Sequence, residues 1–209
     1  MKVIREPVNF YTHAFPAVLA VPAAALLFAR SETPAEMISG SVYGACAFIL
    51  FLISAIYHGF PVTDYWIRFW QKFDHCCIYL MIAGTYTPTS LLVFSGATKW
   101  TLFGLIWLIA LSGCLLKICN RLTNERISLA LYLLMGCMIV PLIHQMLSVL
   151  PLAAVVWMLL GGVFYIGGTY FYYKDRPMGK YVHSHGIWHI FVVLGAISHF
   201  IYIYFYLFR

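Results

Sequence analysis

The chain has 209 residues, of which 63% are hydrophobic and only 10% are charged. Ordinary soluble domains carry about a quarter charged residues, so a single water-exposed globular core is excluded. The formal net charge of +6 raises nucleic acid as a partner, but the basic residues are spread over short connections. That distribution favours membrane topology and contact with anionic lipid head groups, with no nucleic-acid partner. We therefore expect an all-α integral membrane protein.

Apolar runs separated by polar residues, proline or glycine predict seven transmembrane helices, which together form a single domain over residues 1–209. Spans of about 20 residues with short connections account for a chain of this length. The N-terminal segment lacks the pattern of a cleaved signal, so we expect the first run to be a retained span. The expected spans are 14–30, 38–60, 73–94, 98–119, 128–147, 151–173 and 186–207.

The charges of the connecting segments predict the orientation of these spans. If the N-terminus is inside, the inside segments hold Lys2, Arg5, Arg68, Lys72, Lys117, Arg121, Arg126, Lys174, Arg176 and Lys180, and the outside segments hold Arg30, Lys99 and Arg209. This excess of basic residues on one side follows the positive-inside rule. We expect the N-terminus in the cytoplasm and the C-terminus outside, in a plasma or inner membrane.

Two histidines, His185 and His189, stand four residues apart at the start of the seventh expected span, so that both imidazoles lie on one helix face. His58, at the end of the second span, and Asp74, in the first turns of the third, are expected at the same depth on the cytoplasmic side. Imidazole gains nothing from lipid and calls for a partner, and neutral imidazoles suit a transition metal, most often zinc. We interpret His58, His185 and His189 as a candidate metal site.

Two further polar residues are expected near this site. Asp74 is nearly the only acidic residue inside an expected span, where a carboxylate is costly and indicates function. The alternative for Asp74 is a structural charge at a helix N-terminus, paired with Lys72 or Arg68. Ser54 stands one turn before His58 on the same face. Its alternative is a hydroxyl bonded to the carbonyl four residues earlier in the helix.

The remaining histidines compete for the role of metal ligand, although a hydrogen-bonded structural histidine is the simpler interpretation of each one alone. His13 is the strongest rival because it lies at the cytoplasmic start of the first span. His75 points away from the site, and His144 lies toward the outer face of the membrane. His183 precedes the seventh span, and His199 lies about 15 Å further along the same helix than His189.

These residues lie in motifs that are spread along almost the whole chain. Through these motifs the chain resembles the hemolysin III family, within the seven-helix superfamily of progestin and adiponectin receptors. The segments are Glu6-Pro-Val-Asn9 followed by Thr12-His13, Ser54-x-x-x-His58, Asp74-His75 followed by Ile82-Ala-Gly-Thr-Tyr-Thr-Pro88, and His185-Gly-Ile-Trp-His189. In the last segment Gly186 stands where alanine is frequent. The aromatic C-terminus is similar to that of animal members linked to macrophage differentiation.

The resemblance implies zinc held by His58, His185 and His189, with Asp74 at a zinc-bound water and Ser54 supporting the site. Some members of the wider superfamily have been proposed to be lipid amide hydrolases, and others are described as receptors. Three protein ligands leave a fourth zinc position open, as in catalytic sites. We therefore expect a zinc-dependent, ceramidase-like hydrolase of a membrane lipid, or a regulator of membrane lipid homeostasis. In the hydrolase, Asp74 accepts and returns a proton and Ser54 orients a ligand or stabilises an oxyanion.

Two alternatives stay open. In the first, the protein is a non-enzymatic lipid sensor or receptor, and a structural zinc joins the second, third and seventh helices. In the second, a homo-oligomer forms a membrane-lytic pore. The absence of a polar stripe along any expected span argues against a wide polar pore.

Overall fold

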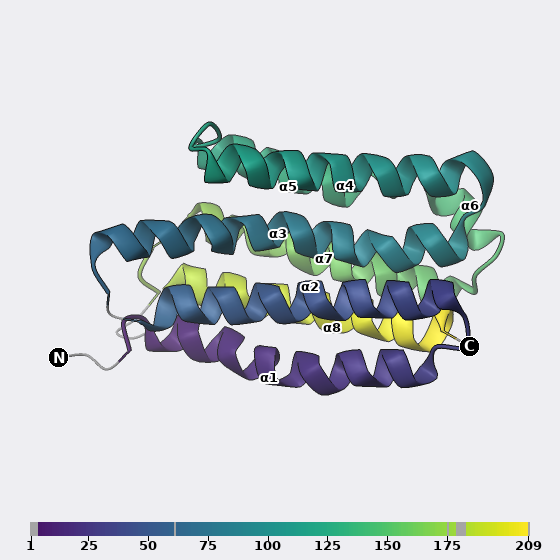
Figure 1. The fold of residues 1–209 in the computed structure, drawn as a ribbon, viewed down its shortest axis with the longest axis horizontal. Helices are drawn as coiled ribbons and strands as arrows, with labels where there is room; N and C mark the ends of the chain where they lie inside the picture. Colours follow the sequence, from purple (N-terminus) through teal and green to yellow (C-terminus); the bar gives the residue numbers. More distant parts are fainter. Residues whose placement is uncertain (1–3, 61, 175, 179–182, 209) are drawn as a thin grey trace.

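A computed structural model describes residues 4–60, 62–174, 176–178 and 183–208 of the chain. Figure 1 shows long helices that run roughly parallel to the longest axis of the molecule. The helices are α1 (Pro7–Arg30), α2 (Pro34–Gly59), α3 (Asp64–Val93), α4 (Gly96–Ile118), α5 (Glu125–Cys137), α6 (Ile143–Leu147), α7 (Leu152–Tyr173) and α8 (Ser184–Tyr202). A 3₁₀ turn at Val140–Leu142 precedes α6, and a π-helical turn at Ile203–Leu207 continues α8.

Within the described ranges, seven helical segments are long enough and apolar enough to cross a membrane, which confirms the expected seven-helix, all-α architecture. Their outer faces carry large apolar side chains. On α4, for example, Leu108, Leu111 and Leu115 are all more than half exposed. Lipid chains cover such a surface in a bilayer. The two ends of the chain lie at opposite ends of the bundle, as seven crossings require (Figure 1). The direction of insertion stays a prediction.

Two helices begin well before the apolar runs that mark their spans. The helix α3 starts at Asp64 and not near residue 73, so Asp74 lies about three turns inside it and not in its first turns. The intervening residues contain no proline or glycine that would interrupt a helix. The helix α1 starts at Pro7, and proline suits a first turn because its missing N–H would be unpaired there.

The fifth span is interrupted. Its main helix α5 ends at Cys137, and the 3₁₀ turn that contains Pro141 separates α5 from the short helix α6. Proline has no N–H to donate to the preceding turn, which accounts for a break in the helical hydrogen bonds at this point. The whole segment Glu125–Leu147 nevertheless has the length and composition of a span.

Close helix contacts hold the first part of the bundle together. A Cβ atom added to Gly44 of α2 would lie 2.5 Å from the Cβ of Ala24 in α1, and one added to Gly84 of α3 would lie 2.6 Å from the Cβ of Cys46 in α2. Small residues at such contacts let helices pack closely in membranes. The last helix, α8, packs on α7 and also reaches α1, which brings the first and last spans together.

We predict that Gly44→Ala destabilises the protein by roughly 1–3 kcal/mol, because the new methyl group has no room against Ala24. Gly104→Ala in α4 is the matched control, since a Cβ there meets nothing within 4 Å. Thermal unfolding of the purified proteins in the same detergent measures both changes. Equal midpoints for the two variants would contradict the close approach of α1 and α2.

Candidate metal centre

Three helix ends meet at the end of the bundle where the N-terminus lies, on the left of Figure 1. His58 lies in the last turn of α2, and His185 and His189 lie in the first two turns of α8. The start of α1 lies beside them, because the backbone N–H of Glu6 donates to the carbonyl of His58 at 3.0 Å. Consecutive helices alternate in direction, so the end of the second span and the start of the seventh share one side.

The three histidines predicted as ligands form a compact cluster. One ring nitrogen from each of His58, His185 and His189 lies within 4.8 Å of the others. The ring centroids are 4.9–5.2 Å apart. Nitrogens around a tetrahedral zinc, each 2.0–2.1 Å from the metal, would be about 3.4 Å apart, so small side-chain shifts suffice to close the site. No other group of three His, Cys, Asp or Glu side chains in the described part of the chain has this spacing.

A carboxylate orients the imidazole of His58. Its Nδ1 atom lies 2.7 Å from Oε2 of Glu6, and Asn9 donates to the same oxygen at 2.8 Å. Partial burial raises the pKa of Glu6, but the hydrogen bonds from His58 and Asn9 and the neighbouring guanidinium of Arg5 bring the pKa below its usual range. Glu6 is therefore ionised, and its carboxylate accepts a hydrogen bond from the N–H group at Nδ1 of His58. This tautomer leaves the lone pair of His58 on Nε2.

The same segment of α1 orients His189. Its Nδ1 atom lies 3.2 Å from the carbonyl oxygen of Asn9 and 3.0 Å from the hydroxyl of Thr12. A carbonyl oxygen can only accept, and the hydroxyl of Thr12 is in reach of the carbonyls of Val8 and Asn9 as a donor. Nδ1 of His189 therefore carries the hydrogen, and the lone pair lies on Nε2. Metal-ligating histidines are held in this way by their second nitrogen.

The residues present fit a metal ion. Nε2 of His58 is buried and has no hydrogen-bond partner in the described part of the chain. A buried imidazole nitrogen with a free lone pair is costly in an apolar environment unless something binds it. His58, His185 and His189 each bring one ring nitrogen within 4.8 Å of the others, a spacing that could hold a metal ion.

Asp74 and Ser54 lie on the wall of the cavity that adjoins this cluster. Asp74 is 8% and Ser54 is 2% exposed, and the same cavity is lined by His185 and His189. The cavity has a volume of about 240 Å³ and continues between α3, α5, α7 and α8, where its lining is mainly apolar. Neither side chain belongs to the three-histidine group. The structure thus brings all five predicted site residues to one region, and their roles stay predictions.

The other histidines are placed differently. His13 stacks on His189, with ring centroids 3.7 Å apart and planes 8° apart, and neither of its nitrogens has a partner among the residues described. It packs on a candidate ligand and is not in the ligand group. His144 is exposed on α6, and His183 is the N-cap residue of α8. His199 bonds the carbonyl of Met158 at 3.0 Å, further along the cavity.

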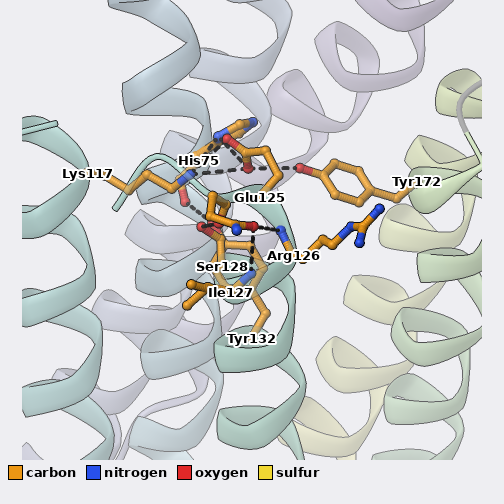
Figure 2. Close-up of polar contacts among 9 residues, drawn as sticks. His75, Lys117, Glu125, Arg126, Ile127, Ser128, Tyr132 and Tyr172 are labelled. Carbon is orange, nitrogen blue, oxygen red and sulfur yellow. Dashed lines mark hydrogen bonds and ion pairs between the residues drawn. The ribbon is translucent and has the colours of Figure 1, made fainter. Parts of the chain in front are cut away.

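His75, the neighbour of Asp74, belongs to a second polar cluster (Figure 2). Glu125 at the start of α5 lies 3.4 Å from Nδ1 of His75 and 3.0 Å from the ammonium of Lys117 in α4. The hydroxyl of Tyr172 in α7 donates to the same carboxylate at 3.4 Å. Glu125 thus joins four helices beside the cavity, and its contact with His75 keeps that imidazole away from the three-histidine group.

The sequence alone predicts no role for Glu6, Asn9 or Thr12, although all three belong to a segment shared with the family. The signal that could have identified them is their spacing of three residues, which places polar groups along one helix face at the depth of the metal ligands. The partners of that face depend on how α1 packs on α2 and α8.

Comparisons with known proteins agree with this architecture. The family described as "Haemolysin-III related" matches residues 1–200. Hemolysin-3 of Bacillus cereus is 32% identical over 207 residues, which cover 96% of this chain and 91% of that protein. The Hemolysin-3 homolog of Bacillus subtilis (strain 168) is 32% identical over 99% of this chain and 96% of its own length. The human Monocyte to macrophage differentiation factor is 30% identical over 96% of this chain and 84% of its own. The chain therefore belongs to the haemolysin-III-related family of multi-pass membrane proteins.

Proposed function

We propose that the protein is a zinc-dependent hydrolase that cleaves a membrane lipid at an amide bond. The observation that carries the proposal is the buried Nε2 atom of His58, which lacks a protein partner in the described part of the chain and belongs to a cluster of three imidazoles. Buried side-chain nitrogens in folded proteins usually have a hydrogen-bond partner, so this unpaired atom supports a bound metal where two further imidazoles adjoin it. A metal ion is the one partner that suits His58, His185 and His189 together.

Zinc suits this cluster best. Neutral imidazole nitrogens favour it, and catalytic zinc sites combine three protein ligands with one open position. When bound there, zinc supplies a Lewis acid and a water whose pKa is lowered toward neutrality. The adjoining cavity supports a route by which a substrate reaches the open position.

In this proposal Asp74 moves the proton. Its carboxylate accepts a proton from the attacking nucleophile and returns it to the leaving amine. Ser54, one turn before His58 on α2, donates a hydrogen bond to a ligand or to the developing oxyanion. Both residues line the cavity beside His185 and His189, which supports these roles.

The hydrocarbon chain of the lipid occupies the apolar part of the cavity, so that the scissile amide lies at the metal centre. The positive-inside rule assigns this end of the bundle to the cytoplasmic side. The amide would then lie near the head groups of the cytoplasmic leaflet, where a lipid needs only to shift sideways between helices to enter the cavity.

A non-enzymatic lipid sensor with a structural zinc is the second candidate. It is favoured by the contacts that Glu6 makes with His58 and that Asn9 makes with His189. A metal held by α2 and α8 would also fix the start of α1 through these hydrogen bonds. Tightly bound zinc with no solvent-accessible coordination position, and no activity on a broad lipid panel, would support the sensor. The Bacillus relatives are named hemolysins. Membrane lysis by this protein would be supported only if it made liposomes leak and a chelator did not change the leakage.

We predict that the purified protein holds one zinc ion per chain and that His58→Ala and His189→Ala each lose most of it, because two imidazoles do not retain zinc against a chelator. Elemental analysis after dialysis measures the metal content. His144→Ala, an exposed histidine far from the cluster, is the control and should keep full occupancy. Full zinc occupancy in the two ligand variants would contradict the proposed metal site.

We predict that Asp74→Asn keeps its zinc but loses at least about 100-fold in turnover of a lipid amide, which is the usual contribution of a general acid–base residue. Release of free fatty acid from a panel of N-acylated membrane lipids measures turnover. Asp64→Asn, at the exposed start of α3, is the matched control. Undiminished hydrolysis by Asp74→Asn would exclude the assigned role.

We predict that Glu6→Ala lowers the affinity for zinc by about 10–100-fold, since loss of a partner to the second nitrogen of a ligating histidine has an effect of this size. Glu6→Gln should lose less, because its amide oxygen can still accept from Nδ1 of His58. Competition with a zinc-binding dye measures affinity, and Glu32→Gln in the connection between α1 and α2 serves as control. Identical affinity in Glu6→Ala and the wild type would show that Glu6 does not orient His58.

A further inference from the structure

Away from the metal centre, the lining of the cavity includes two polar rings, His199 of α8 and Tyr165 of α7. Their ring centroids are 5.5 Å apart. Each ring rests against a glycine of the opposite helix. A Cβ atom on Gly161 would lie 2.4 Å from the ring of His199, and one on Gly195 would lie 2.8 Å from the ring of Tyr165.

Each of the two helices contributes one glycine and one polar ring. Gly161 and Tyr165 are four residues apart on α7, and Gly195 and His199 are four residues apart on α8, so each pair lies on one helix face. A larger residue at either glycine would displace the facing ring. The sequence therefore makes room, inside a membrane bundle, for one imidazole and one phenol at the same place.

Hydrogen bonding leaves one acceptor and one donor unused at this place. Nε2 of His199 lies 3.0 Å from the carbonyl oxygen of Met158 and must donate to it, which leaves Nδ1 as a bare acceptor. Nδ1 of His199 and the hydroxyl of Tyr165 are both buried, and neither has a hydrogen-bond partner among the described residues. Unpaired polar groups of this kind are costly in an apolar environment.

The distance to the metal centre defines the ligand that could use both groups. His199 lies ten residues beyond His189 on the same helix, which corresponds to about 15 Å. At the spacing of an extended chain, about a dozen covalent bonds span that distance. The cavity is lined mainly by apolar side chains such as Met81, Leu133 and Val192.

We propose that this part of the cavity binds a hydroxyl group on the hydrocarbon chain of a lipid, about a dozen bonds from the group held at the metal centre. The hydroxyl donates to Nδ1 of His199 and accepts from the hydroxyl of Tyr165, so one group satisfies both. An unsubstituted hydrocarbon chain would leave both unpaired. The inference rests on the proposed function in one respect, namely that the cavity holds the chain of the lipid, and it makes no use of hydrolysis.

The test measures binding and not turnover. Purified, zinc-loaded protein is equilibrated with radiolabelled stearic acid, 12-hydroxystearic acid or 3-hydroxystearic acid in the same detergent. The wild type should bind the 12-hydroxy chain about tenfold more tightly than stearic acid, as a gained hydrogen-bonded pair allows. The 3-hydroxy chain, whose hydroxyl lies near the metal, should show no such gain. Equal affinity for all three chains would overturn the proposal, since it would mean that water alone serves the two groups.

Two variants connect the preference to the named rings. Tyr165→Phe removes only a hydroxyl and should reduce the preference for the 12-hydroxy chain to threefold or less, with unchanged affinity for stearic acid. His199→Phe should act in the same direction, and its thermal midpoint reports whether it folds. Tyr170→Phe, an exposed tyrosine of α7, is the matched control. A preference that survives in Tyr165→Phe and in folded His199→Phe would overturn the assignment. If the wild type prefers the 12-hydroxy chain but hydrolyses no lipid, only the proposed hydrolase activity would be overturned.

Discussion

A buried imidazole nitrogen without a partner is costly inside an apolar helix bundle, and the hydrogen bonds that meet this cost organise one end of the molecule. His58 and His189 are buried, so protein groups supply the partners of their rings. Glu6 serves Nδ1 of His58, while Asn9 and Thr12 serve Nδ1 of His189. One short face of α1 thereby determines the tautomers of rings on two other helices. The Nε2 atoms that remain are what make the cluster suitable for a metal.

The seven-helix architecture could be predicted because lipid offers no hydrogen-bond partners. Each span must therefore form its backbone hydrogen bonds within a helix, and it appears in the sequence as a long apolar run. Helix ends could not be predicted in the same way. Hydropathy marks the part of a helix in contact with lipid, and α3 continues beyond that part to Asp64. The break between α5 and α6 has a visible cause in Pro141, but the apolar run continues through it and conceals the interruption.

The candidate ligands His58, His185 and His189 could be predicted because alternating helix directions bring the end of the second span and the start of the seventh to one side. Helix direction fixes how deep each residue lies in the membrane, but not which helices are neighbours. The contact between Glu6 and His58 could not be predicted, since it depends on the packing of α1 against two helices. Nor could it be predicted that Glu125, far along the chain, holds His75 away from the cluster. Contacts between residues distant in sequence account for most of what the sequence left open.

The closing of the bundle by α8 against α1 has a consequence for biosynthesis. A growing chain delivers its N-terminal helices first, so Glu6 and His58 can meet while much of the protein is still being made. His185 and His189 arrive with the final helix. A metal held by all three histidines can therefore be captured only by a chain whose last helix has entered the membrane and returned to the first.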